Sequence, residues 1–164
     1  MARNIRVLHC RPEDVFEVLG DGWLYPSWVV GASRMRDVDE AWPEVGATLD
    51  HSFGVWPALV NDKTIVEQYV PPRMMVLRAR GWPAGEARVT LEVKTSGDGS
   101  VVRIQEEVIT GPARLVPRPI MDLMLHWRNT EALHRLAYLA EGRAAAASRR
   151  LPQPSTAEGE TLAS

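Results

Sequence analysis

Apolar and polar residues alternate through the middle of the chain with a period of two, which is typical of strands that bury one face. Turn-forming glycines and prolines separate most of these segments. The clearest hairpin has its turn at residues 96–99, where two glycines tolerate the positive φ of a tight connection. The pattern therefore predicts an antiparallel meander. Its six strands are expected near residues 32–39, 47–55, 63–70, 73–81, 86–95 and 100–109.

The N-terminal segment predicts one more strand and two short helices. Ile5 and Val7 alternate with their neighbours in a short strand-like stretch. Pro12 then suits a first helical turn, and an apolar stripe continues until Gly20 ends the helix. Proline interrupts the aromatic residues 23–28, so we expect only a short second helix there.

A long helix is predicted from Ile120 to about Gly142, because this stretch has no proline or glycine in its interior and is dense in leucine, alanine, arginine and glutamate. After Gly142 the chain loses aromatic residues and gains alanine, serine, proline and threonine. Such a segment cannot bury enough apolar surface to offset its ordering entropy, so we expect disorder beyond about residue 150. The chain thus divides into one domain, residues 1–142, and a tail, residues 143–164.

This order of elements predicts an α+β fold in which a curved antiparallel sheet of about seven strands wraps around the long C-terminal helix. The two short helices after the first strand would close one end of the curve. A sheet bent in this way leaves an internal cavity wherever the helix does not fill the space.

Composition and charge narrow the class of protein. Apolar residues make up 45% of the chain and charged residues 24%, which matches a globular protein rather than a disordered or fibrous one. Arginines gather toward the C-terminal third, but the net charge of −2 and the lack of a recognised motif argue against nucleic-acid binding. We interpret these arginines as a solvated surface.

Cys10 is the only cysteine, so no intrachain disulfide can form and a reducing compartment fits best. No apolar run has the length of a signal peptide or a membrane span, and we expect a cytoplasmic protein. His126 and His134 lie eight residues apart rather than four, and no carboxylate cluster completes a metal site. The glycine motifs of phosphate and dinucleotide sites are also missing, so we expect no metal and no cofactor.

Three stretches, in this order of elements, resemble a known family. They are GWPAGEA at residues 81–87, EEVITGP at 106–112 and RNTEAL at 128–133. The chain resembles the polyketide cyclase/dehydrase-like branch of the START-related helix-grip superfamily (SRPBCC) over roughly residues 3–142. The resemblance implies the helix-grip fold. Family members include ligand carriers, aromatase/cyclases and hydrolases, so the fold alone does not specify a function.

Two polar residues stand out on otherwise apolar rows of the expected strands. His51 shares a face with Leu49 and Phe53, and Glu106 shares one with Ile104. A histidine titrates near neutral pH and a buried carboxyl group can hold or release a proton, which makes these two the candidate catalytic residues. The alternative is that these two side chains orient a ligand or form a hydrogen bond with each other, without a catalytic role. The residues themselves leave both interpretations open.

Aromatic and apolar side chains on the strands and helices are candidate contacts for a ligand. Tyr25 and Trp28 would cap one end of the cavity with rings that have a polar edge. Met124 and Trp127 could project from the long helix toward the sheet. The predicted ligand-binding residues are Tyr25, Trp28, Leu49, Phe53, Leu77, Leu91, Ile104, Met124 and Trp127.

The strand near residues 63–70 does not reveal which of its rows faces inward, because both rows mix apolar and polar side chains. The two candidate rows are Ile65, Glu67 and Tyr69 on one side and Val66, Gln68 and Val70 on the other.

The leading hypothesis is a binding protein for a small hydrophobic or aromatic metabolite, such as a lipid or polyketide, because the expected lining is apolar with few polar positions. The alternative, implied by the resemblance, is an aromatase/cyclase or dehydratase that acts on a polyketide-like substrate by acid/base chemistry. A purely structural or partner-binding module would instead have a filled core and an exposed apolar patch. The expected partner is the small hydrophobic ligand. The sequence leaves open whether the protein forms a homodimer.

Overall fold

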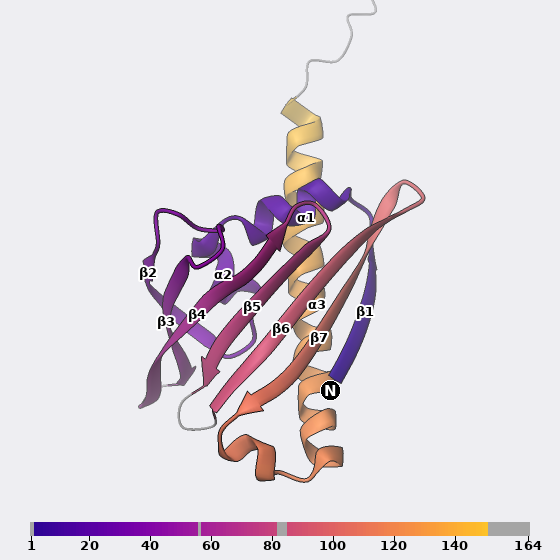
Figure 1. Ribbon diagram of the computed structural model, residues 1–164. Coiled ribbons are helices and arrows are strands. Elements are labelled where there is room, and N and C mark those ends of the chain that lie inside the picture. Colours follow the sequence, from indigo (N-terminus) through magenta and orange to yellow (C-terminus); the bar gives the residue numbers. More distant parts are fainter. Residues whose placement is uncertain (1, 56, 82–84, 151–164) are drawn as a thin grey trace, which may run out of the picture.

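The computed structural model describes residues 2–55, 57–81 and 85–150 of the 164-residue chain. Seven strands form one antiparallel sheet in the order β1-β7-β6-β5-β4-β3-β2, so β2 to β7 follow one another as a meander and β1 pairs with β7. The long helix α3 lies along one face of the curved sheet (Figure 1). The short helices α1 and α2 both contact α3. The predicted α+β helix-grip architecture is confirmed.

All the predicted strands and helices are present, and the described residues form two further short 3₁₀ helices. The strands are β1 (Ala2–Leu8), β2 (Ala32–Val38), β3 (Thr48–Val55), β4 (Ala58–Val70), β5 (Met74–Gly81), β6 (Gly85–Ser96) and β7 (Gly99–Thr110). The helices are α1 (Pro12–Leu19), η1 (Gly22–Leu24), α2 (Tyr25–Trp28), η2 (Pro112–Leu115) and α3 (Arg118–Arg150).

The first helix, α1, begins at Pro12, and an aromatic contact holds it against the sheet. Pro12 occupies the first turn, where its missing N–H costs nothing. The carboxylate of Asp14 accepts a hydrogen bond of 2.9 Å from the backbone N–H of Arg11, which satisfies a donor at the positive end of the helix. The ring of Phe16 lies 5.9 Å from the ring of Tyr69 on β4, centroid to centroid. This contact fixes α1 against the inner face of the sheet.

The strand β4 contains a bulge between Val66 and Gln68 that changes its inward row. Before the bulge Thr64 and Val66 are buried, whereas after it Tyr69 pairs with the buried Met75 and packs against the core. The extra residue of a bulge shifts the alternation by one position. Neither of the two rows considered from the sequence therefore faces inward along the whole strand.

The strand β1 turns Ile5 and Val7 outward, and it turns the polar Asn4 inward along with the core residue Leu8. Ile5 and Val7 are exposed, while Asn4 is buried against α3. Its Nδ2 donates to Thr130 Oγ1 at 2.7 Å and to the carbonyl oxygen of His126 at 3.0 Å. Because both acceptors lie on α3, this amide ties the first strand to the long helix and helps to set where the helix crosses the sheet.

The helix α3 continues to Arg150, past the end that the sequence predicted at about Gly142. Four consecutive alanines at residues 144–147 are strong helix formers and offset the cost of one exposed glycine. The disorder expected beyond about residue 150 concerns residues outside the described part of the chain. No helix among the described residues has a stretch both long and apolar enough to cross a membrane.

A candidate ligand-binding cavity

A cavity of about 430 Å³ lies between the sheet and the N-terminal half of α3, with α2 on one side. Most of the side chains that face it are apolar. On α3, Met121, Leu125 and Ala132 line it because their helical spacing places them on the face turned toward the sheet. The strands contribute Phe53, Leu77, Ala79, Val89, Ile104 and Val108.

A hydrogen-bonded cluster stands on the α2 side of the cavity. Thr64 Oγ1 on β4 lies 3.0 Å from the hydroxyl of Tyr25 and 3.0 Å from Nε2 of His51. The rings of Tyr25 and His51 are 5.1 Å apart, and Trp28 meets the Tyr25 ring edge-on at 5.5 Å, both measured between centroids. All four side chains are buried. A single buried hydroxyl therefore positions both rings.

The cluster is uncharged near neutral pH. Burial, helped by the positive charge of Arg36, lowers the pKa of His51 from 6.5 to about 4. Burial also raises the pKa of Tyr25 to about 12, so its hydroxyl keeps the proton. His51 is 2% exposed, yet its Nδ1 has no hydrogen-bond partner among the described residues. Because His51 lines the cavity, this ring nitrogen is a candidate contact for a ligand.

A second polar cluster joins the last strand to the long helix. Arg128 of α3 donates to Oε1 of Glu106 on β7, in an ion pair on the cavity wall. Glu106 is 2% exposed and Asn129 is 1% exposed. Within the described residues, Oε2 of Glu106 and Nδ2 of Asn129 make no hydrogen bond. Unsatisfied buried polar atoms cost about 1–3 kcal/mol each, so a ligand that satisfied them would bind more tightly.

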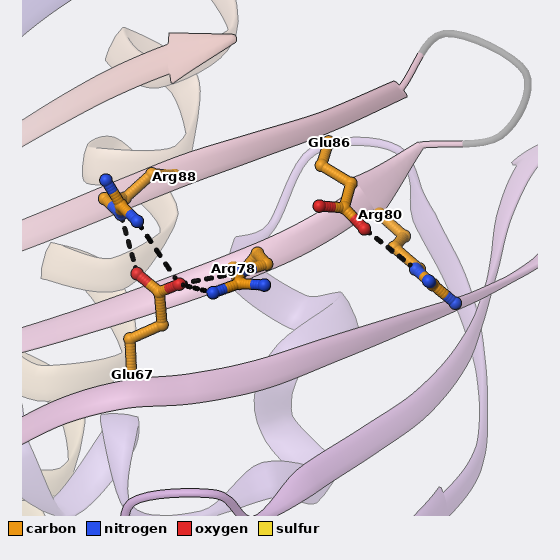
Figure 2. Close-up of polar contacts among 5 residues, drawn as sticks. All are labelled: Glu67, Arg78, Arg80, Glu86 and Arg88. Atoms are coloured by element: carbon orange, nitrogen blue, oxygen red, sulfur yellow. Dashed lines mark hydrogen bonds and ion pairs between the residues drawn. The ribbon is translucent and has the colours of Figure 1, made fainter. Parts of the chain in front are cut away.

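Ion pairs also occupy the rim of the cavity and the outer face of the sheet. Arg80 of β5 and Glu86 of β6 line the cavity near the ends of their strands, with 3.0 Å between Arg80 Nε and Glu86 Oε1. Figure 2 shows this pair beside a separate network, in which Arg78 and Arg88 each donate from Nε to a different oxygen of Glu67 at 2.6 Å. The network links β4, β5 and β6 and does not line the cavity.

The structure brings the two candidate catalytic residues of the sequence analysis to one cavity, His51 from β3 and Glu106 from β7. Their inward orientation, expected from the alternation of the strands, is confirmed by their burial. The catalytic role of these two residues stays a prediction. Six of the predicted ligand-binding residues line the cavity, and their contact with a ligand also stays a prediction. Those residues are Tyr25, Trp28, Phe53, Leu77, Ile104 and Met124.

Three of the predicted ligand contacts lie elsewhere. Leu49 and Leu91 are fully buried in the packed core and do not line the cavity. Trp127 is 67% exposed, so the expectation that it projects from the helix toward the sheet is wrong. Because Leu125 lies on the buried face of α3, a residue two positions later points about 200° away from it around the helix.

Several functional candidates were missed in the sequence. Thr64 and Asp62 lie on β4, where the bulge concealed the inner row. Asp62 is buried, burial raises the pKa of its carboxyl group, and its Oδ2 has no partner among the described residues. Asn129 lies on the same face of α3 as Leu125 and Ala132, so the helical spacing of the apolar residues could have predicted its inward position. The pairing of Arg128 with a distant strand has no local sequence signal.

Comparisons with known proteins agree with this fold. The model of the family described as "Polyketide cyclase / dehydrase and lipid transport" matches residues 3–141. Protein CV1439 from Chromobacterium violaceum has a TM-score of 0.62 at 22% identity, over 85% of this chain and 96% of that chain. Protein NE0264 from Nitrosomonas europaea has a TM-score of 0.67 at 13% identity, over 87% of this chain and 95% of that chain.

A larger protein shares the fold over part of its length. The di-domain ARO/CYC StfQ from the steffimycin biosynthetic pathway has a TM-score of 0.69 at 13% identity, over 87% of this chain and 51% of that chain. A comparison with curated proteins found no match. The family model spans all seven strands and the part of α3 that lines the cavity. The chain therefore belongs to the polyketide cyclase / dehydrase and lipid transport family.

Proposed function

We propose that the protein binds a small hydrophobic or aromatic metabolite, lipid-like or polyketide-like, in the internal cavity. The observation that carries this proposal is a mostly apolar cavity of about 430 Å³ whose lining includes buried, unpartnered polar atoms of His51, Glu106 and Asn129 among the described residues. Small-molecule sites usually combine an apolar wall with a few placed polar groups. Their volumes usually fall within about 300–1,000 Å³, and this cavity has a comparable size.

The comparisons support a hydrophobic ligand. The family description names polyketide chemistry and lipid transport, and both concern hydrophobic molecules. StfQ, which shares the fold, is described as an ARO/CYC from a biosynthetic pathway. A metabolite with an apolar body and a few oxygen atoms fits both descriptions and the lining of the cavity.

Native mass spectrometry of the purified protein tests this proposal even though the ligand is unidentified. We expect a species heavier than the bare chain that loses its extra mass on denaturation, or uptake of an added probe, 2-acetonaphthone. The variant Ala132→Phe places a ring on the cavity wall and should lower the bound fraction. Trp127→Ala, on the exposed side of the same helix, should not. A protein that carries no passenger and takes up no probe, or equal occupancy in all three proteins, would contradict the proposal.

An aromatase/cyclase or dehydratase acting on a polyketide-like substrate is the second candidate function. One observation favours it, namely the neutral imidazole of His51 with an unpartnered Nδ1 beside the protonated hydroxyl of Tyr25. The imidazole is unprotonated near neutral pH and can take a proton from the acidic carbon between two carbonyl groups, although its lowered pKa makes it a weaker base than an ordinary histidine. A positioned general base contributes about 10²–10⁴-fold to a rate.

Turnover of a poly-β-ketone substrate by His51→Gln and Glu106→Gln separates the two candidates. If the protein is an enzyme, His51→Gln should lower the rate at least about 100-fold while substrate binding changes little. Unchanged rates in both variants would remove these residues from the mechanism and leave the binding function alone.

A further inference from the structure

The charges around the cavity indicate the class of its ligand, an inference that rests on the binding function proposed above. Four charged side chains line the cavity among the described residues, and they form two ion pairs. Arg80 pairs with Glu86 (Figure 2), with 3.0 Å between Arg80 Nε and Glu86 Oε1, and Arg128 pairs with Glu106. His51 adds no charge near neutral pH, because its pKa is lowered to about 4. The described lining therefore has no uncompensated charge.

An anionic ligand would find no free cation among the described residues at the buried end of this cavity. Arg128 already pairs with Glu106, so a carboxylate at Arg128 would either share its guanidinium with a second carboxylate or displace Glu106 and leave a side chain that is 2% exposed as an unpaired charge. Placed beside the free Oε2 of Glu106, the same carboxylate would meet a like charge. A buried charge without a partner costs far more than a buried neutral group that forms hydrogen bonds. The arrangement therefore disfavours ligands such as free fatty acids.

The unpartnered atoms specify which neutral groups the ligand should present. Glu106 forms its ion pair with Arg128 through Oε1, and the second carboxylate oxygen, Oε2, is an acceptor that requires a hydrogen-bond donor from the ligand. The amide Nδ2 of Asn129 can only donate and requires an acceptor. Both side chains are at least nine-tenths buried, so few other groups can reach these atoms.

We infer that the cavity selects an uncharged ligand with an apolar body, which offers a hydroxyl group to Glu106 and a carbonyl group to Asn129, and that it rejects the corresponding carboxylate. The ion pair between Glu106 and Arg128 determines this selectivity, because it occupies the cation that a buried carboxylate would need.

Three probes built on one naphthalene ring test the inference by calorimetric titration near neutral pH. They are 6-hydroxy-2-acetonaphthone, 2-acetonaphthone, which lacks the hydroxyl, and 6-hydroxy-2-naphthoate, which replaces the ketone by a carboxylate. We expect the hydroxyketone to bind about tenfold more tightly than 2-acetonaphthone, the effect of one hydrogen bond to a charged group. The carboxylate should bind at least about 100-fold more weakly than the hydroxyketone.

Substitutions in the ion pair should reverse the preference. Glu106→Gln frees Arg128 and gives the lining a positive charge, so the carboxylate probe should gain at least about tenfold in affinity. The double variant Glu106→Gln/Arg128→Gln restores a neutral lining and should reject the carboxylate again. Asn129→Leu removes the amide donor and should weaken both ketones by a similar factor. Circular dichroism of each variant shows which proteins are folded, and the probe ranking in the wild-type protein is informative even if Glu106→Gln unfolds.

The outcomes separate this inference from the proposed function. If 6-hydroxy-2-naphthoate binds to the wild-type protein as tightly as the hydroxyketone, the inference fails and the binding function stands. A folded Glu106→Gln protein that gains no affinity for the carboxylate would also overturn it. If none of the three probes binds to protein that mass spectrometry shows to be free of a passenger, both the inference and the proposed function are contradicted.

Discussion

The rings of Tyr25 and His51 lie 5.1 Å apart and direct their polar atoms to the same hydroxyl, that of Thr64. The three residues come from α2, β3 and β4, so one side chain joins three elements at the cavity wall. Thr64 is fully buried, and solvent cannot replace its hydrogen bonds. The positions of both rings should therefore depend on this hydroxyl.

Thr64→Val removes the shared hydroxyl with almost no change in side-chain volume. Two buried polar atoms would lose their partner, and we expect the free energy of unfolding to fall by about 2 kcal/mol. Tyr25→Phe alone should cost about 1 kcal/mol. Urea denaturation of both variants and of the double variant measures the coupling. If Tyr25→Phe costs as much in the Thr64→Val protein as in the wild type, the two groups do not interact as the structure indicates.

His51 should make the stability of the protein depend on pH. Its pKa is 6.5 as an ordinary histidine and about 4 in the folded protein, so the unfolded state takes up the proton first as the pH falls. Stability is therefore lost below the unfolded pKa, by about 2 kcal/mol near pH 5. His51→Gln should lose less stability than the wild type between about pH 7.5 and pH 5. Asp62, whose pKa burial raises, acts in the opposite direction but equally in both proteins. If the wild type and His51→Gln lose the same unfolding free energy over this pH range, His51 is not buried as a neutral ring.

The ion pair of Glu106 and Arg128 should matter far more than a surface pair on the same helix. Arg128→Met leaves a buried carboxylate without its partner and should cost about 3 kcal/mol of unfolding free energy. Arg135→Met breaks an exposed pair with Glu131 and should cost about 0.5 kcal/mol or less. Equal effects in thermal or urea unfolding would mean that Glu106 is not confined as described.

Gly31 should control the position of one cavity residue. Its φ is +99°, and an added Cβ would lie 2.3 Å from the Cζ atom of Phe53, whose ring lines the cavity. Gly31→Ala should cost at least about 1 kcal/mol and should change the affinity for 2-acetonaphthone by displacing this ring. Gly46→Ala is the matched control, because its φ is +92° and nothing lies within 4 Å of an added Cβ. An unchanged probe affinity in a folded Gly31→Ala protein would contradict the assigned contact.

The fold and the inward position of His51 and Glu106 were accessible from the sequence because both depend on local signals. Alternation with a period of two places each of these residues on the apolar face of its strand. Glycine and proline at the turns mark where one strand ends and the next begins. An antiparallel meander needs little more than this information, since consecutive strands pair with each other.

The remaining features depend on tertiary contacts that leave no local pattern. The bulge after Val66 arises from the pairing of β4 with β5, so the inward position of Thr64 could not be read from residues 63–70 alone. Trp127 is large and apolar, and its exposure follows only from the rotation of α3, to which the hydrogen bonds of Asn4 contribute. The partner of Arg128 lies on a strand that is distant in sequence.

The most direct test of a ligand-binding cavity is to locate a bound probe by nuclear magnetic resonance, through Overhauser contacts between 2-acetonaphthone and assigned methyl groups. We predict contacts to the methyl groups of Leu77, Ile104 and Val108 on the cavity wall. We predict none to Leu123, which is exposed on the outer side of α3. Contacts confined to Leu123 and other exposed positions, or no contacts at saturating probe, would contradict the account.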